Sequence, residues 1–351
     1  MHFKQKQASM ALGGLKDPSM PAVSPMMALL VFFLFSFSTQ ATLIWDETFL
    51  VNTDIYAIVA VSETTLYAGT FTGGVFRTDD GGDSWVLLGL TGKPIVSMVA
   101  TSPLTLYAGT NREGIFYSQD GGVSWSSLND GLPGNQVQSL SVVNGVVYAS
   151  VREHTTGHIH LFRLNGNLWE LTGLVHFNAA DVIEFNNALY AGGEGGVRRS
   201  TDGGNTWIEV NNNVGPNALA VWNGTLYAGT SDHVWRLNPD DTWSKLYQGL
   251  LTATIGDLIV WQKTLYAAND GGGVASLSVG SDIWTPENTA LTAHRGALLT
   301  LAATSTALYV GVGAGSVLRA QLEPIPEPST LVLLGIGLLG IMGLSKRRRQ
   351  K

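Results

Sequence analysis

Short runs of apolar, β-branched and aromatic residues, separated by polar turns, recur along most of this chain. The clearest stretch is Leu189 to Trp207, which reads LYAGGEGGVRRSTDGGNTW: two apolar runs, a polar turn and a tryptophan. Partial alternation of apolar and polar residues over such short runs is typical of half-buried β-strands. The pattern therefore predicts an all-β protein built from one repeated unit of strands and turns.

The repeat has a nearly constant period. The tyrosine of the Leu-Tyr-Ala pattern recurs with gaps of 37 to 43 residues, at Tyr67, Tyr107, Tyr148, Tyr190, Tyr227, Tyr266 and Tyr309. A period of about 40 to 45 residues is that of one four-stranded blade of a β-propeller. In the first full copy we expect strands at residues 55–61, 65–69, 74–78 and 84–88. The small Ala68-Gly69 pair suits a crowded position near the ring axis.

The ring is expected to close through its first strand. Tryptophans end the successive polar turns at Trp85, Trp125, Trp169, Trp207, Trp243 and Trp284, one fewer than the tyrosines. Trp45 lies 40 residues before Trp85, and the last copy stops after Val317-Leu318-Arg319. We therefore predict a seven-bladed propeller whose last blade is completed by Thr42 to Val51. Closure removes strand edges that would otherwise pair with other chains.

The polar turn resembles the Asp box, or bacterial neuraminidase repeat, Ser/Thr-x-Asp-x-Gly-x-x-Trp. Three copies are complete, with motif residues Thr78, Asp80, Gly82 and Trp85; Ser118, Asp120, Gly122 and Trp125; and Ser200, Asp202, Gly204 and Trp207. The copies before Trp169, Trp243 and Trp284 are eroded. The resemblance implies a structural turn that lies away from the ligand face. It says nothing about chemistry, because such boxes occur in sialidases, sortilin-like receptors and photosystem assembly factors alike.

Composition narrows the classes of partner. The chain has no cysteine, so neither disulfides nor thiolate metal sites are available. Between Thr42 and Ile325 there are 12 Lys and Arg against 25 Asp and Glu, a net charge of −13. An acidic ring is a poor partner for phosphate backbones, so we expect no nucleic acid binding.

The N-terminus reads as a leader. A lysine-bearing region precedes the apolar run Met27 to Phe37 and a small-residue site that ends at Ala41. This order predicts a secretory signal peptide over residues 1–41, with the propeller over residues 42–325. A retained membrane anchor is the alternative, and Met10, Met20 or Met26 could be the true start.

The C-terminus resembles the PEP-CTERM sorting signal. Its parts stand in order: Pro326, Glu327 and Pro328, then an apolar segment over Leu331 to Ser345, then Arg347, Arg348 and Arg349. The apolar part is expected to form one hydrophobic helix that holds the protein transiently in the inner membrane, with the basic cluster on the cytoplasmic side. The resemblance, over residues 326–351, implies a Gram-negative bacterium whose exosortase processes the protein for the cell surface or extracellular matrix. An ordinary tail anchor is the alternative reading.

Candidate chemistry is sparse. Arg77, Arg199, Arg236 and Arg319 recur at one position of the repeat and so do not form the arginine cluster of a sialidase. A glycosidase built from another carboxylate pair remains open, since two Asp or Glu side chains could meet across the ring. The three histidines of VREHTTGHIHLF (His154, His158 and His160) are candidate metal ligands, although a polar loop entering a strand explains them as well. We expect no bound metal or cofactor. The calcium-like run at residues 79–83 is part of the Asp-box turn and lacks a distal glutamate.

Strand direction sorts the loops onto two faces. Asp-box turns belong to one face, and the loops between second and third strands and between blades belong to the other, where propellers usually bind ligands. Candidate ligand-face residues are Arg112, Arg152, His154, Asp232 and His233, together with Glu113, Glu153, Glu194, Asp270, His294 and Arg295. Solvated loops would look the same. Trp222 and Trp261 share one repeat position, where they could stack on sugar rings or pack locally.

These features predict an exported, surface-sorted and non-catalytic propeller that serves as a binding or matrix module. Exopolysaccharide and a surface protein are the candidate ligands. A propeller hydrolase acting on glycans and a protein-binding assembly scaffold are the alternatives. A convergent carboxylate or histidine cluster on the irregular face would favour the enzyme.

Overall fold

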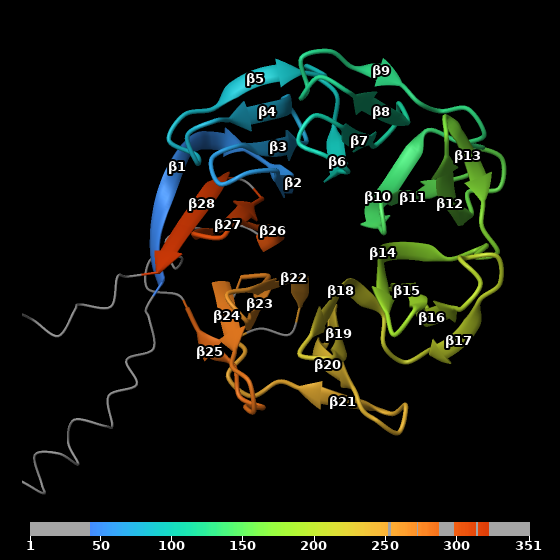
Figure 1. Ribbon diagram of the computed structural model, residues 1–351, viewed down its shortest axis with the longest axis vertical. Coiled ribbons are helices and arrows are strands. Elements are labelled where there is room, and N and C mark those ends of the chain that lie inside the picture. The colour runs from blue at the N-terminus through green and yellow to red at the C-terminus, as the bar shows by residue number, and fades with distance from the viewer. Residues whose placement is uncertain (1–42, 252–253, 272, 288–297, 314, 323–351) are drawn as a thin grey trace, which may run out of the picture. The chain divides into compact units, whose positions relative to one another are not determined.

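The computed structural model describes residues 43–251, 254–271, 273–287, 298–313 and 315–322. Contacts divide the chain into one unit of residues 42–324 and another of residues 1–41 and 325–351. The described residues all belong to the first unit and form seven four-stranded antiparallel sheets. These sheets follow one another around a central opening (Figure 1). The predicted seven-bladed propeller is confirmed, whereas the predicted signal peptide and C-terminal helix lie outside the described residues.

The first four blades follow the chain in order, from innermost to outermost strand. Blade 1 contains β2 (Ile55–Ala60), β3 (Leu66–Thr70), β4 (Gly74–Thr78) and β5 (Val86–Gly89). Blade 2 contains β6 (Ile95–Ala100), β7 (Leu106–Thr110), β8 (Ile115–Ser118) and β9 (Ser126–Ser127). Blade 3 contains β10 (Gln136–Val143), β11 (Val146–Arg152), β12 (Ile159–Asn165) and β13 (Leu168–Leu171). Blade 4 contains β14 (Asn178–Phe185), β15 (Ala188–Glu194), β16 (Gly196–Ser200) and β17 (Ile208–Asn211).

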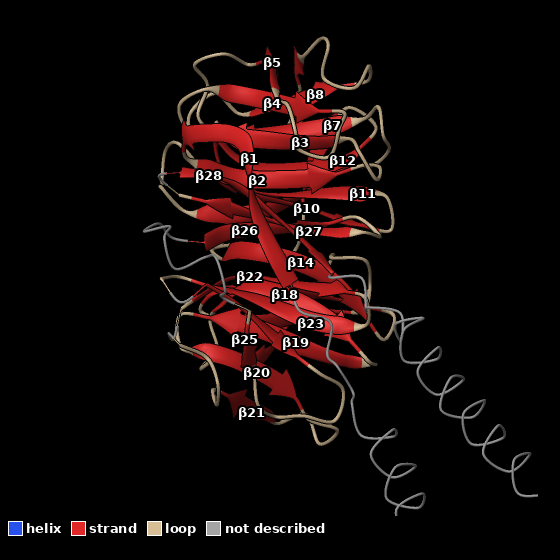
Figure 2. Cartoon of the chain, turned by 90° about the vertical axis from the view of Figure 1, so that its left-hand side faces the viewer, coloured by secondary structure: helices blue, strands red, loops and turns tan. Residues whose placement is uncertain are grey.

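The remaining blades repeat this order, and the strands of all of them run across the thickness of the ring (Figure 2). Blade 5 contains β18 (Pro216–Trp222), β19 (Thr225–Thr230), β20 (His233–Leu237) and β21 (Trp243–Leu246). Blade 6 contains β22 (Ile255–Trp261), β23 (Thr264–Asn269), β24 (Gly273–Leu277) and β25 (Thr285–Pro286). Blade 7 contains β26 (Leu298–Ala303), β27 (Ala307–Val312), β28 (Gly315–Leu322) and β1 (Leu43–Thr53).

The first strand closes the ring as the sequence predicts. Strand β1 pairs antiparallel with β28, with Leu43 opposite Leu322 and Trp45 opposite Ala320. The Trp45 side chain is buried, and its Nε1 donates a 2.7 Å hydrogen bond to the carbonyl oxygen of Glu287 in blade 6. The two ends of the propeller therefore meet in one sheet, and β28 is not left as an open edge.

Glycine at the end of the second strand lets neighbouring blades approach near the axis. A Cβ at Gly69 would come within 2.6 Å of the Ile95 side chain of the next blade. A Cβ at Gly109 would come equally close to Val137, one blade further on. A side chain at either position would force the blades apart. This contact is the physical reason for the small residues that the repeat places there.

Buried side chains of the described residues form seven clusters, one at each junction between blades. Each cluster contains, or has packed against it, one tryptophan that lies in or directly before an outer strand. They are Trp85, Trp125, Trp169, Trp207, Trp243, Trp284 and Trp45 in ring order. The fold is therefore stabilised chiefly between blades, as expected for a closed array of repeats.

Candidate functional site

The three complete polar turns, Thr78–Trp85, Ser118–Trp125 and Ser200–Trp207, are called aspartate turns from here on. In the last of them the Ser200 hydroxyl accepts a 2.9 Å hydrogen bond from the amide of Gly204. The Asp202 carboxylate accepts hydrogen bonds from the amide and hydroxyl of Thr206, at 2.9 and 2.6 Å. These bonds, with that from Ser200, lower the pKa of Asp202 to about 2.

The other two aspartate turns have the same internal bonds. The carboxylate of Asp80 accepts from Ser84, and that of Asp120 accepts from Ser124. Both aspartates have a pKa of about 2, chiefly because of the serine hydroxyl. Each of these carboxylates therefore stabilises its own turn.

The repeated arginines also act inside the scaffold. The Tyr67 hydroxyl and Arg77 Nη1 both donate to the carbonyl oxygen of Gly121 in the next blade, at 2.9 and 3.4 Å. At the ring closure the Tyr309 hydroxyl and Arg319 Nη1 donate in the same way to the carbonyl oxygen of Gly81, at 3.1 and 2.9 Å. Arg163, at the same repeat position, makes this contact with the Gly203 carbonyl oxygen at 3.1 Å. Arg236 instead pairs with Asp282, so the contact accounts for the arginine in only some of the blades.

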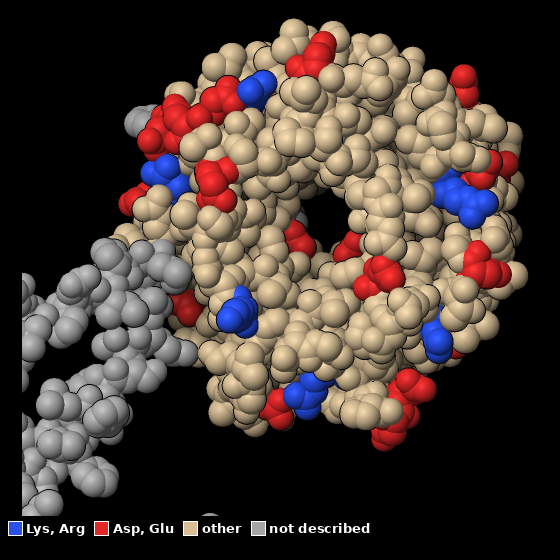
Figure 3. Space-filling model, in the orientation of Figure 1, with Lys and Arg blue, Asp and Glu red and all other residues tan. Residues whose placement is uncertain are grey.

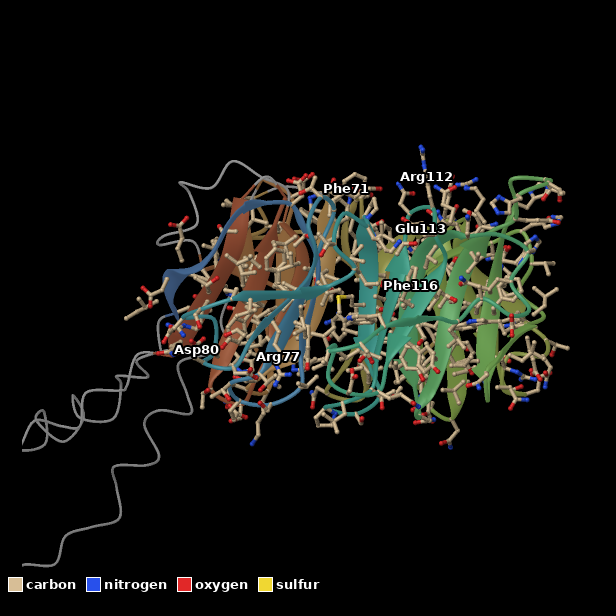
Figure 4. All side chains as sticks on the ribbon, turned by 90° about the horizontal axis from the view of Figure 1, so that it is seen from above. Phe71, Arg77, Asp80, Arg112, Glu113 and Phe116 are labelled. Carbon is tan, nitrogen blue, oxygen red and sulfur yellow. The ribbon has the colours of Figure 1, made fainter. Side chains whose placement is uncertain are left out.

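The predicted ligand-face residues lie on the side opposite the aspartate turns. Phe71, Arg112 and Glu113 are at one end of the molecule, and Arg77 and Asp80 are at the other (Figure 4). The structure does not join the predicted residues into one cluster, because their contacts stay within single blades. Arg152 donates to the Gly157 carbonyl at 2.7 Å; Asp232 pairs with Lys245 at 2.6 Å and with His233 at 3.2 Å. His294 and Arg295 lie outside the described residues.

The central channel of the ring contains a cavity of about 460 Å³. Its mouth on the ligand face carries Tyr56, Gln138, Asn178 and Asn217. Tyr56, Gln138 and Asn217 occupy register shifts near the start of their inner strands. A bulge breaks the alternation of side chains and so redirects these three residues. The rings of Tyr56 and Phe71 lie 5.2 Å apart between centroids.

Two carboxylates line the channel below this mouth. Asp181 Oδ2 accepts a 3.0 Å hydrogen bond from the amide of Leu219, and its Oδ1 accepts from the amide of Val182 at 2.8 Å and from the Ser141 hydroxyl at 3.0 Å. In the same way Asp257 binds the amides of Leu258 and Leu301, each at 2.7 Å. Inner strands have a neighbour on one side only, so these amides need an acceptor from elsewhere. Each aspartate therefore ties its blade to the next one.

Both channel aspartates hold their protons more tightly than an ordinary carboxyl group. Desolvation within the channel raises the pKa of Asp181 to about 6. It raises the pKa of Asp257 to about 7, and the charge of Asp181 adds to that increase. Both side chains are half-buried, with protein around them on the wall of the channel. Figure 3 shows acidic side chains around the central opening, with Lys and Arg farther out.

Asp181 and Asp257 were not among the site residues predicted from the sequence. A usable signal was present, because Asp181 and Asp257 occupy the same position of the repeat in two blades. The other blades carry Ala57, Ser97, Ser139, Ala218 and Thr300 there. A charged residue within an otherwise apolar inner strand indicates a channel-facing position.

The structure brings His158 and His160 together with His176, and not with His154 as the sequence predicted. The ring of His158 stacks on His176 at 4.2 Å between centroids, and His160 meets His176 edge-on at 5.2 Å. His160 Nε2 lies 3.6 Å from a carboxylate oxygen of Glu153. His176 comes from the loop between blades, and His154 is not part of this contact. Within the described residues no group of His, Asp and Glu side chains has an arrangement that could hold a metal ion.

Trp222 and Trp261 are buried, which decides between the two alternatives given for them, stacking on sugar rings and local packing. Their exposed fractions are 6% and 4%. Trp222 Nε1 donates to the carbonyl oxygen of Lys263 at 2.9 Å, and Trp261 Nε1 donates to that of Thr304 at 2.8 Å. The alternative of local packing is confirmed, because each indole joins its blade to the next.

Comparison with known families identifies the C-terminal segment. Residues 324–349 match the PEP-CTERM protein-sorting motif. This signal marks proteins that are exported across the membrane to the cell surface, and it implies processing by an exosortase. The chain is therefore an exported, sorted protein with a propeller fold. In the described part of the chain no helix is long and apolar enough to cross a membrane.

Similarity to solved structures concerns the fold alone. The structure titled YCF48 bound to D1 peptide is 14% identical, with a TM-score of 0.64 over 81% of this chain and 98% of that chain. A catalytically inactive virginiamycin B lyase from Staphylococcus aureus with Quinupristin is 13% identical, with a TM-score of 0.64 over 81% and 100%. The extracellular domain of a putative one component system, BT4673 from B. thetaiotaomicron, is 13% identical, with a TM-score of 0.65 over 80% and 40%. No curated protein matches the chain.

Proposed function

We propose that this exported protein is a non-catalytic binding module that takes an extracellular polysaccharide at the mouth of its central channel. The observation that carries the proposal is the contrast between the two faces. On the aspartate-turn face, the repeated polar side chains bind the protein's own backbone. At the channel mouth, Gln138 and Asn178 make no side-chain hydrogen bond within the described part of the chain.

The chemistry of the mouth suits sugars. Amide side chains both donate and accept hydrogen bonds, as paired recognition of hydroxyl groups requires. Tyr56 is 38% exposed and offers a flat apolar surface in the same cavity. Concave sites with a few convergent polar groups are the usual places for small ligands. The acidic surroundings favour a neutral chain over a polyanion.

The test is binding of the purified full chain to a glycan array and to the extracellular polysaccharide of the producing bacterium. The channel variant combines Gln138→Ala and Asn178→Ala. The control is Asn167→Ala, an exposed amide in the turn between β12 and β13 on the opposite face. We expect saturable binding by the wild type and the control, and at least tenfold weaker binding by the channel variant. Equal binding by all three proteins, or no bound glycan, contradicts the proposal.

A second candidate function, hydrolysis of a glycan, is favoured by the raised pKa values of Asp181 and Asp257. A general acid works best when its pKa is near the working pH. Analysis of products on the same samples separates the two functions. Shortened glycans that disappear in Asp257→Asn would establish the hydrolase, and unchanged glycans support binding alone. If no glycan binds, the assembly scaffold that holds a protein partner becomes the leading alternative.

A further inference from the structure

The junction between blades 5 and 6 lacks the contact that joins blades 1 and 2. At the first junction, Gly121 of the next aspartate turn gives its carbonyl oxygen to Tyr67 and Arg77. The equivalent residues between blades 5 and 6 are Tyr227, Arg236 and Gly280. Within the described residues, neither Tyr227 nor Arg236 has a hydrogen bond to Gly280. Instead, Arg236 Nη1 contacts the Asp282 carboxylate at 2.6 Å.

The space around these glycines differs in the same sense. A Cβ at Gly121 would lie 3.2 Å from the Tyr67 hydroxyl and 3.3 Å from Arg77. A Cβ at Gly280 would meet nothing within 4 Å. The two glycines have similar backbone conformations, with φ of 70° and 81°. The backbone at the two glycines is therefore alike, and the difference lies in the position of the neighbouring side chains.

The turn of blade 6 departs from the complete aspartate turns in sequence. Leu277 and Val279 stand where a complete aspartate turn has its hydroxyl residue and its aspartate, as at Ser200 and Asp202. The turn consequently lacks the internal side-chain bonds of the complete copies. It closes through a 3.0 Å backbone hydrogen bond from Ser281 to Ser278.

A pocket of about 430 Å³ occupies this junction. Its polar lining includes Asn223, Thr225, Tyr227, Arg236 and Asp282. The indole of Trp222 forms part of the wall and lies 5.7 Å from the Tyr227 ring between centroids. The pocket therefore places aromatic rings and the Tyr227 hydroxyl beside the ion pair of Arg236 and Asp282.

We propose that this pocket binds an N-acetylated amino sugar, whose acetamido carbonyl oxygen sits between Tyr227 and Arg236 in place of a glycine carbonyl. A neutral carbonyl suits the site, because a ligand carboxylate would meet the charge of Asp282. Sugar hydroxyls can donate to Asp282 and can bond to the amide of Asn223. This site lies apart from the channel mouth and does not depend on the function proposed there.

The test is calorimetric titration of the purified full chain with N-acetylglucosamine and its dimer, with glucose and glucosamine as matched sugars. N-acetylalanine amide supplies the same carbonyl on a peptide. We expect the acetylated sugars to bind at least tenfold more tightly than the other compounds. Equal affinity for glucose, tighter binding of the peptide compound, or no heat with any ligand overturns the assignment.

Two variants locate the site. Tyr227→Phe removes one hydroxyl, and Arg236→Gln removes the guanidinium; each should weaken acetylated-sugar binding about tenfold or more, the usual consequence of losing such a hydrogen bond. The control is Tyr190→Phe at the same repeat position in blade 4, which should bind as the wild type does. If both site variants fold, by circular dichroism, and bind like the control, the pocket is not the site. The contrast between sugars tests the ligand chemistry even if a variant is unstable.

Discussion

The hydroxyl of Tyr309 donates a 3.1 Å hydrogen bond to the carbonyl oxygen of Gly81, which joins the last blade to the first. Arg319 Nη1 reaches the same oxygen at 2.9 Å. Farther out, Trp85 Nε1 lies 3.2 Å from the Thr48 hydroxyl on β1. Ring closure therefore uses the same tyrosine and arginine contacts as the junction between blades 1 and 2, in addition to the pairing of β1 with β28.

Trp45→Ala should weaken this closure. The indole is buried between blades 6 and 7, and replacing a buried tryptophan with alanine costs about 3–5 kcal/mol. Ile44→Ala is the matched control, because Ile44 is adjacent to Trp45 on β1 and is 47% exposed. Urea denaturation followed by tryptophan fluorescence measures both variants. Similar losses for the two would argue against the role of Trp45 in the core.

Ser200→Ala should destabilise the third aspartate turn. The change leaves the buried amide of Gly204 without its acceptor, which costs about 1–3 kcal/mol. Ser127→Ala, an exposed serine on β9, provides the control. Thermal unfolding should show a clearly lower Tm for Ser200→Ala alone. An unchanged Tm would mean that the turn does not contribute to stability.

Asp257 should make stability fall as the pH rises. Its folded pKa, about 7, lies above that of an unfolded aspartate, about 3.9. The protonated folded form is favoured, so this contribution is present below pH 4 and is lost as the pH rises toward 7. Asp257→Asn should flatten this part of the profile, and Asp46→Asn, an exposed carboxylate on β1, should leave it unchanged. Denaturation at a series of pH values measures the slope, and identical profiles for wild type and Asp257→Asn would contradict the pKa.

The sorting signal should depend on its basic cluster. Replacing Arg347, Arg348 and Arg349 with glutamine should leave the unprocessed form in the producing cells, because the cluster fixes the orientation of the apolar segment. Gln350→Ala should be processed normally. Immunoblotting follows processing at the C-terminus. N-terminal sequencing determines the first residue of the mature protein, which is expected to be Thr42. Normal processing of the arginine variant, or a protein that begins at Met1, would contradict the expected route.

Most of the fold was predictable because it follows from the sequence repeat. The tyrosine period determined the number of blades, and the position of Trp45 indicated which strand closes the ring. The expected strands of blade 1 agree with β2 to β5 within two residues. A closed array leaves little freedom once its unit is known.

The candidate site was less predictable, because it depends on departures from the repeat. In the sequence Asp181 and Asp257 are isolated charges 76 residues apart, and only the closed ring places both in one channel. His176 joins His158 through a loop between blades, a contact that sequence spacing does not show. Trp222 appeared available for sugars only because its burial depends on the neighbouring blade.

The central claim is that the channel mouth on the face opposite the aspartate turns binds a glycan. The most direct measurement is a calorimetric titration of the full chain with oligosaccharides from the bacterium's own extracellular polysaccharide, using wild type, Tyr56→Ala and Leu104→Ala. Leu104 is 58% exposed and lies in the loop between β6 and β7, on the aspartate-turn face. We expect Tyr56→Ala alone to weaken binding, by about tenfold, as the loss of an aromatic contact would. Equal affinities for all three proteins would contradict the claim.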